Sequence, residues 1–361
     1  MSKTETEGPA PDQVDTFAEA EALIDEVGPR PAGSDAERRA ARQLAGRLEG
    51  LGREVNVEPF AVWPAWAVGY TVNLILAVVG SVLSVSSAKL GTGLVLLATV
   101  LTFLDLSGIT PTTRRLLGRR ASQNVVSWGE RERPGALLLV AHYDSGPTRT
   151  WPLRPMFWAL LALLACCVLR VGGMSGTALT AIQFVPTVGL ILYVPLLLDI
   201  ALSPAAPGEN DNASGVALVL RLAERLDLLE GFGVHVVLTG SQKTMAQGMR
   251  AFLKSHRGQL ARDRTVMLNV DRVGSGEIHV TKKEGPLLTV RSHPQLVALM
   301  DAPTLVNREP SDGYAAASAQ LPAITVTCDG ERLEEDTLTK VEEFCVDFAG
   351  RLDEELSPPE R

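Results

Sequence analysis

The hydrophobic residues of this chain fall into two long windows that are almost free of charge. No charged residue occurs from Ala61 to Ala88, and a second apolar run continues from Leu90 to Leu104. A further pair of apolar runs lies between Pro155 and Leu198, interrupted by Arg170 and a glycine-rich turn. Each of these four runs supplies about 20 mostly apolar residues, which is the length that a helix needs to cross a bilayer. The pattern therefore predicts four membrane-spanning helices.

The runs pair into two predicted transmembrane hairpins, over 61–112 and 151–203. Four tryptophans lie near the ends of runs, where interfacial anchors are expected: Trp63, Trp66, Trp151 and Trp158. The alternative is four helices buried in a protein core, which the shorter runs leave open. Because each hairpin returns the chain to the side that it left, the polar segments are expected to form one domain on a single side of the membrane. Those segments are 1–60, 113–150 and 204–361.

Positive charge is concentrated on the polar side of the predicted spans. The turns between spans carry Lys89 and Arg170, whereas the flanks on the polar side carry six arginines: Arg114, Arg115, Arg119, Arg120, Arg149 and Arg154. Since positively charged flanks stay in the cytoplasm, we predict a multi-pass membrane protein with its polar domain on the cytoplasmic side. The acidic N-terminal segment has no apolar run behind a basic start, so we expect no cleavable signal peptide.

Outside the apolar windows, short β-type segments alternate with amphipathic ones. Six segments rich in β-branched and apolar residues predict strands over 53–60, 123–128, 136–141, 233–240, 264–271 and 322–328. Helices are predicted over 34–52, 215–229 and 245–256. The first of these begins with a capping box of Ser34 and Glu37 and ends near Gly52. Strands that alternate with helices form an open, largely parallel sheet with helices on both faces.

Composition narrows the classes of function. The chain has 361 residues and a formal net charge of −8, and it lacks the basic face that nucleic-acid binding requires. Its four cysteines have neither metal-type spacing nor a disulfide framework, which is typical of buried thiols in a reducing compartment. We therefore expect no nucleic-acid partner.

Polar side chains cluster where the predicted strands end. One strand leads into His142 and Asp144, another ends at Asp271, a third runs into Ser241, and Asp211 directly precedes a helix. In an open parallel sheet, the carboxyl ends of the strands form the edge that binds ligands. Taken singly, each residue has a simpler explanation as a helix cap or a turn. Their combination predicts a functional site.

The order of these segments resembles the co-catalytic zinc exopeptidases, the family of bacterial leucyl aminopeptidase, glutamate carboxypeptidase II and glutaminyl cyclase. The matching segments are Gly28–Ser34, Ala141–Ser145, Gly208–Gly215, Asn269–Asp271, Ser311–Asp312 and Asp336–Thr337. Together they cover most of the chain outside the apolar windows. The resemblance implies a zinc-exopeptidase-like α/β/α sandwich with a largely parallel mixed sheet, here interrupted by two transmembrane helical hairpins.

The resemblance also implies the ligands of one zinc ion. In that family a histidine, a bridging aspartate and a later aspartate hold this ion, and they fall on His142, Asp211 and Asp271. Asp144 would lie behind His142 and fix its imidazole, since a metal-bound histidine needs a partner for its second nitrogen.

The second zinc site is where this sequence departs from the family. The family uses a Glu-Glu pair, the first as general base and the second as ligand, and a C-terminal histidine. These positions are occupied by Gln242, Lys243 and Arg332, and no histidine follows His293. Glutamine cannot accept a proton at neutral pH, and charged lysine or arginine cannot ligate zinc. We expect Lys243 and Arg332 instead to pair with Asp144, Asp211 or Asp271.

These replacements predict a membrane-embedded pseudoenzyme that binds peptide termini or a partner protein. No metal cofactor is expected, or at most one zinc on His142, Asp211 and Asp271. One alternative is an active exopeptidase or aminopeptidase that works with this single metal. Another is a transporter, but the predicted spans hold few polar groups beyond Asn73 and Asp105, so no ion path is visible.

Overall fold

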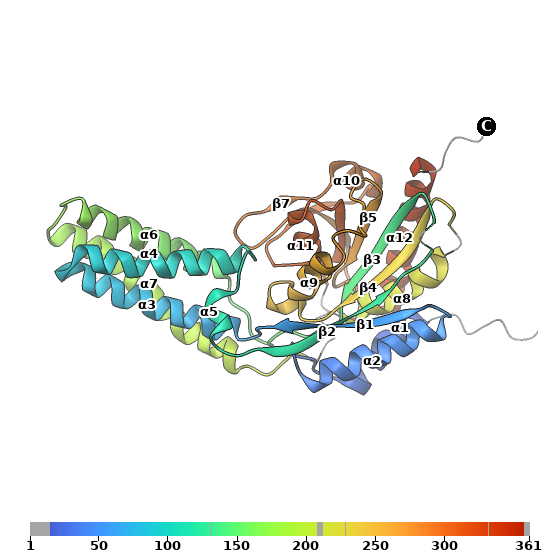
Figure 1. Cartoon of the computed structure of the whole chain (residues 1–361), viewed down its shortest axis with the longest axis horizontal. Helices are drawn as coiled ribbons and strands as arrows, with labels where there is room; N and C mark the ends of the chain where they lie inside the picture. The colour runs from blue at the N-terminus through green and yellow to red at the C-terminus, as the bar shows by residue number, and fades with distance from the viewer. Residues whose placement is uncertain (1–14, 131, 208–211, 228, 331, 357–361) are drawn as a thin grey trace, which may run out of the picture.

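The computed structural model describes residues 15–130, 132–207, 212–227, 229–330 and 332–356. Figure 1 shows two parts, an α/β domain and a bundle of long helices that projects from one end of it. The bundle is made of chain segments inserted after the first and third strands of the domain.

Nine strands in the described part of the chain form one mixed sheet. Its centre is four parallel strands in the order β4 (Phe232–Thr239), β3 (Gly135–His142), β5 (Thr265–Val270) and β9 (Ala323–Cys328). Beyond β4 the sheet continues with two antiparallel strands, β2 (Arg120–Ser127) and β1 (Val55–Val62). All six predicted strands are therefore present, and the largely parallel centre is confirmed.

The other edge of the sheet contains three strands that the sequence pattern does not predict. They are β6 (Ile278–Glu284), β7 (Val290–Arg291) and β8 (Thr304–Asn307). β6 pairs antiparallel with β9 and β7, and parallel with β8. These strands are short and partly polar, so their sequences lack the clear alternation of a half-buried strand.

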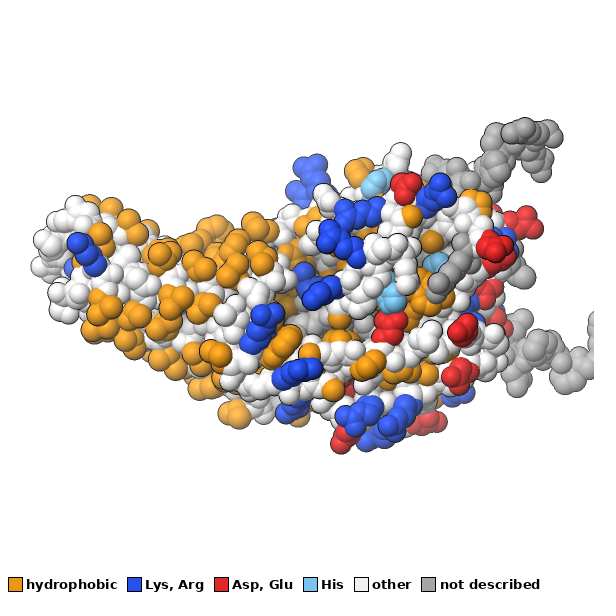
Figure 2. Space-filling view, viewed as in Figure 1, with side chains coloured by type: hydrophobic (Ala, Val, Ile, Leu, Met, Phe, Trp, Pro, Cys, Tyr) orange, Lys and Arg blue, Asp and Glu red, His pale blue; other side chains and the backbone are white. Residues whose placement is uncertain are grey.

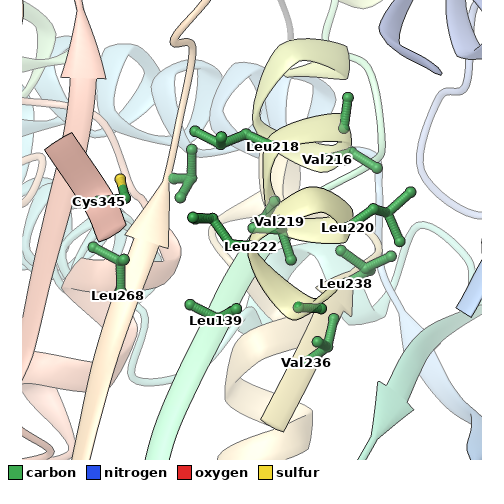
Figure 3. Close-up of a cluster of buried hydrophobic side chains, with 14 of the residues drawn as sticks. Leu139, Val216, Leu218, Val219, Leu220, Leu222, Val236, Leu238, Leu268 and Cys345 are labelled. Carbon is green, nitrogen blue, oxygen red and sulfur yellow. The ribbon is translucent and has the colours of Figure 1, made fainter. Parts of the chain in front are cut away.

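Alternate residues of the central strands face two separate cores. Leu137 and Leu139 of β3 lie in one core, and Leu138 and Val140 lie in the other. The first core is covered by α1 (Thr16–Ala22), α2 (Asp35–Gly50), α8 (Ala213–Leu226), α10 (Pro294–Met300) and α12 (Glu335–Leu356). The second is covered by α9 (Gln247–Ser255) and α11 (Asp312–Ser318). Figure 3 shows α8 packed over Leu139, Val236 and Leu238. The predicted α/β/α sandwich is therefore confirmed.

The start of α2 follows the predicted cap with one change. The hydroxyl of Ser34 accepts the backbone N–H of Glu37 at 3.1 Å. The carboxylate of Glu37 reaches back one residue further than in a capping box and accepts the N–H of Gly33 at 2.7 Å. The helix ends at Gly50, and Gly52 adopts a left-handed conformation with φ 76°.

The bundle contains four helices that are long and apolar enough to cross a membrane. They are α3 (Trp66–Ser86), α4 (Ala88–Leu106), α6 (Leu153–Val171) and α7 (Thr177–Leu202). α3 packs against α4 and α7, and α6 packs against the same two helices. The outward faces are apolar and exposed (Figure 2); Phe184 and Val185, for example, are 67% and 71% exposed. These helices are thus not buried within the chain, unlike the core helices of the alternative interpretation.

Several polar side chains inside the bundle are paired with one another. Asn73 contacts Thr102, and Gln183 donates to the hydroxyl of Ser81. Asp105 forms a buried ion pair with Arg114 of α5 (Thr112–Arg115) at 2.5 Å. Since polar side chains within a span are costly unless they are paired, these contacts fix how the helices pack.

Candidate functional site

The polar residues that follow the predicted strands converge at one edge of the sheet. His142 ends β3, Asp271 directly follows β5, and Gln242 begins a short 3-10 turn (Gln242–Thr244) after β4. All three side chains are buried. They meet because β3, β4 and β5 are parallel neighbours, whose carboxyl ends share one edge. Asp211, which is expected beside them, lies outside the described residues.

The imidazole of His142 lies between two carboxylates. Its Nδ1 is 3.3 Å from Oδ1 of Asp144, and its Nε2 is 3.5 Å from Oδ1 of Asp271. Burial disfavours the imidazolium and Lys243 repels it, but the two carboxylates outweigh both and raise the pKa of His142 to about 9. Burial also works against ionised Asp271, yet its contact with His142 and the charge of Arg272 hold its pKa well below the ordinary value. The two carboxylates therefore favour the imidazolium form of His142.

Asp144 is anchored by the main chain of the segment in which the family motif is replaced. Its Oδ1 accepts the backbone N–H of Gln242 at 2.9 Å, and its Oδ2 accepts that of Lys243 at 3.0 Å. Two such charge-assisted bonds fix the carboxylate beside His142. Lys243 thus holds Asp144 through its backbone, whichever contacts its ammonium makes.

The side chain of Gln242 lies where the resemblance places the general base. Its Nε2 donates to the carbonyl of Pro310 at 3.0 Å. Its Oε1 is buried, without a hydrogen-bond partner among the described residues. An amide in this position cannot take a proton from water at neutral pH. Lys243 is partly buried, and its positive charge lowers the pKa values of both His142 and Asp271.

Asn212, at the start of α8, joins the ends of two strands. Its Nδ2 donates to the carbonyls of Val270 at 2.9 Å and His142 at 3.3 Å. Its Oδ1 accepts the backbone N–H of Arg272 at 2.8 Å. Sequence patterns do not reveal this role, because all three partners are main-chain atoms far away in the sequence.

Several residues at this edge have a left-handed backbone conformation that is usually reserved for glycine. After β4, the φ angles of Ser241, Met245 and Ala246 are 57°, 72° and 52°, and φ of Arg272 is 55°. Each such residue costs of the order of 1 kcal/mol, and residues of this kind cluster at functional sites. The hydroxyl of Ser241 donates to Oε1 of Glu37 at 3.0 Å, which helps to stabilise this conformation.

A cleft of about 430 Å³ opens beside Asp271. Three arginines line it, namely Arg272, Arg308 and Arg332. Arg272 lies 3.6 Å from Asp271 and 3.6 Å from Glu309. Arg332, where the resemblance expects a histidine, is exposed and makes no ion pair with any acid in the part of the chain that the structure describes. It is therefore a wall of the cleft and not a partner of Asp144 or Asp271.

Three further buried acids lie around the cluster. Sequence patterns do not reveal that their pKa values are raised. Burial and the nearby charge of Asp144 raise the pKa of Glu37 to about 7. Burial raises the pKa of Asp312 to about 7 as well, although a hydrogen bond from Thr239 opposes this. The pKa of Glu284 is also raised by burial. Partial protonation of Glu37 and Asp312 limits the negative charge that this edge carries near neutral pH.

Comparison with known proteins places this geometry in a family. A family model described as "Peptidase family M28" matches residues 124–325, which is more than half of the chain. This chain belongs to peptidase family M28. No curated protein matches the sequence significantly. The expected relationship to the zinc exopeptidases is thus confirmed.

Solved structures share the fold of this M28 chain. A zinc aminopeptidase from Bacillus subtilis is 13% identical with a TM-score of 0.55, and the match covers 97% of each chain. A Zn-dependent exopeptidase from Parabacteroides distasonis is 11% identical with a TM-score of 0.55, covering 93% of this chain and 96% of the other. A glutaminyl cyclase from Fimbriiglobus ruber is 14% identical with a TM-score of 0.51, covering 96% and 97%. Similarity at these identities establishes the fold alone.

The side chains of this M28 chain do not fit a two-zinc centre. Protein zinc sites are built from cysteine, histidine and carboxylate ligands. The positions expected for the second ion hold an amide, an ammonium and a guanidinium, from Gln242, Lys243 and Arg332. Neither cation has a lone pair to offer a metal in its charged form.

A single ion would find two ligand atoms in the described residues. Nε2 of His142 and Oδ1 of Asp271 are both buried there without a hydrogen-bond partner. No group of three His, Cys, Asp or Glu side chains suited to a metal occurs within these described ranges. A third protein ligand would have to be Asp211.

Proposed function

We propose that this M28 chain is a membrane-anchored pseudopeptidase whose cleft binds a peptide terminus or a partner protein without hydrolysing it. The observation that carries this proposal is the side-chain amide of Gln242 and its hydrogen bond. Its amide stands at the position that the resemblance assigns to the general base, and it donates to the carbonyl of Pro310. An amide cannot activate a water molecule as a base. Asp144 is held in place by the N–H groups of Gln242 and Lys243, which supports a site maintained for its structure.

The proposed location is a membrane, with the α/β domain on the cytoplasmic side. The apolar outer faces of the four long helices support it, because a soluble protein rarely exposes so large an apolar surface. The charges at the two ends of the bundle support the orientation. The distal turns carry Lys89 and Arg170, whereas the domain end carries the arginine-rich segment 114–120.

Two measurements on detergent-purified protein test the loss of activity. Metal content would be determined by mass spectrometry after dialysis, and hydrolysis would be followed with aminoacyl reporter substrates, with and without chelator. We expect less than one equivalent of zinc and a rate that does not exceed the protein-free rate. Stoichiometric zinc together with chelator-sensitive hydrolysis would refute the proposal.

A reversion series asks whether the replaced residues are the cause. Gln242→Glu, Lys243→Glu and Arg332→His would be combined in one variant. Because the anchor of Asp144 uses backbone N–H groups, we expect this variant to fold and to gain zinc. A restored general base contributes about 10² to 10⁴-fold to the rate, so a gain of this order is expected with a suitable substrate. Arg308→His, in the same cleft but outside the replaced motif, is the matched control.

The second candidate function is hydrolysis by a single-metal exopeptidase. It is favoured by Nε2 of His142 and Oδ1 of Asp271, which lie 3.5 Å apart and lack hydrogen bonds among the described residues. Zinc titration followed by calorimetry distinguishes the two candidates. Tight binding of one equivalent that His142→Ala abolishes would favour this function, whereas binding that His142→Ala leaves unchanged would exclude the site.

A further inference from the structure

A second cavity, of about 360 Å³, lies where both helical hairpins join the α/β domain. Its walls include Trp66 and Ala67 at the start of α3, Ile200 near the end of α7, and the segments before α2 and after β3. Its size is within the range of small-ligand sites. It shares no lining residue with the cleft beside Asp271, so the two are separate sites.

The charges that line this junction cavity are all positive. They belong to Arg120, the first residue of β2, and to Lys243, and no described acidic residue lines it. Most of the other lining side chains are apolar or small. The stem of Arg120 packs closely over Gly33, where an added Cβ would lie 2.7 Å from that of Arg120. Cations beside an apolar wall are suited to an anionic group attached to hydrocarbon.

Exposed leucines and arginines lie close in the sequence to the residues that line the cavity. Leu116 and Leu202 are each 85% exposed, and Leu116 lies between Arg115 and Arg119 in the sequence. The guanidinium of Arg115 lies 5.2 Å above the ring of Trp63. Figure 2 shows basic side chains between the apolar bundle and the polar domain. This mixture of leucine, tryptophan and arginine is typical of protein surface at the level of lipid headgroups.

We propose that the junction cavity binds the phosphate headgroup of an anionic phospholipid. Arg120 and Lys243 would hold the phosphate, and Trp66 and Ile200 would contact the glycerol and the first methylene groups. This inference relies on the proposed membrane location, and it does not depend on whether the chain hydrolyses peptides.

The charge pattern also predicts which lipids are excluded. Arginine recognises phosphate oxygens in a bidentate manner, and lysine adds a point charge. A zwitterionic lipid carries the same phosphate together with a quaternary ammonium, for which the cavity lining offers no described acidic partner. Anionic lipids should therefore bind more tightly than phosphatidylcholine of the same chain length.

Native mass spectrometry of the full-length, delipidated protein in neutral detergent tests this inference. The probes are dihexanoyl phosphatidylglycerol, dihexanoyl phosphatidylcholine and inorganic phosphate. We expect one tightly bound phosphatidylglycerol, with affinity at least about fivefold above that for phosphatidylcholine. Inorganic phosphate should compete only weakly, because it cannot use the apolar wall.

Variants assign the binding to this cavity. Arg120→Gln and Lys243→Gln should each weaken phosphatidylglycerol binding by about fivefold. Arg264 is an exposed arginine at the amino end of β5, whereas the candidate site lies at the carboxyl ends of the parallel strands. Arg264→Gln should leave phosphatidylglycerol binding unchanged. Arg120 is exposed, so its variant remains informative if Lys243→Gln fails to fold.

Three outcomes would overturn the proposal: equal affinity for the two lipids, equal competition by inorganic phosphate, or binding insensitive to both substitutions. A separate assay of membrane integration, by alkaline extraction of native membranes, tests the proposed location. A protein that is extracted but still binds phosphatidylglycerol would refute the location and retain the site.

Discussion

The backbone N–H of Lys243 donates a hydrogen bond to Oδ2 of Asp144 at 3.0 Å. Lys243 thus holds the carboxylate beside His142 through its backbone N–H, a group that every residue except proline possesses. The identity of the side chain at this position is therefore free to change while the acid stays in place. The position of Asp144 therefore does not depend on which side chain residue 243 carries.

Replacing Asp144 should destabilise the protein strongly. Asp144→Asn removes the charge beside His142 and presents an amide N–H₂ to one of two backbone donors. Loss of a buried, hydrogen-bonded charge costs about 2–4 kcal/mol, so the midpoint of thermal unfolding in detergent should fall by several degrees. Asp35→Asn, at an exposed position of α2, is the control and should change it little. Equal midpoints for the two variants would contradict this account.

Glu37 should make stability depend on pH. Its pKa is raised from 4.5 to about 7, so folding favours the protonated form. The stability from this group is fully present below about pH 4.5 and is lost as the pH rises through about 7. At most, the loss is about 3 kcal/mol. Glu37→Gln should flatten the dependence of the unfolding midpoint on pH between 4.5 and 7. An unchanged profile would show that another group dominates.

Gly91 should be essential for the packing of α4 against α3. A Cβ at this position would overlap the backbone nitrogen of Ser84 and the carbonyl oxygen of Gly80. Gly91→Ala should therefore separate the helices and cost about 1–3 kcal/mol. Gly93, two residues further along α4, has nothing within 4 Å of an added Cβ, so Gly93→Ala should be neutral or slightly stabilising. Thermal stability in detergent compares the pair directly, and equal losses would argue against close contact of the helices.

Replacing one member of the buried ion pair of Asp105 and Arg114 should destabilise the protein more than replacing both. Asp105→Leu leaves the guanidinium of Arg114 buried without its partner, which costs about 3–5 kcal/mol. Arg114→Met alone should cost a similar amount. The double variant removes both charges and should recover much of the loss. Additive losses in this cycle, measured by thermal unfolding, would show that the two side chains do not interact.

The sequence contains enough information for the central fold, because buried strands and helices leave a strong hydrophobic period. The segments that became β3, β4, β5 and β9 are continuous apolar runs, as strands covered on both faces should be. β6 includes Lys282 and Lys283 and lies near the sheet edge, so its pairing partners determine its structure more than its own pattern does. Edge strands of this kind are not predictable from periodicity alone.

The candidate site was predictable as a set of positions but not as a set of contacts. His142, Asp144 and Asp271 do lie together, since parallel strand ends meet at one edge. The main-chain anchor of Asp144 and the bridging role of Asn212 depend on backbone atoms, which sequence patterns do not report. The expected pairing of Arg332 with Asp144 or Asp271 does not occur, because its segment places the side chain at the exposed wall of the cleft.

At the base of each helical hairpin, the chain segments that enter and leave the bundle are paired with each other through their backbones. Val62 at the end of β1 pairs with Arg120 at the start of β2, and Pro147 pairs with Ala205 across the base of the second hairpin. The bundle is therefore connected to the domain at four points, and only residues 63–65 separate β1 from α3. Four connections restrict how far the domain can move relative to the bundle. If the bundle spans a membrane, the cleft therefore stays near a constant height above the lipid, where a membrane-bound partner can reach it by lateral diffusion.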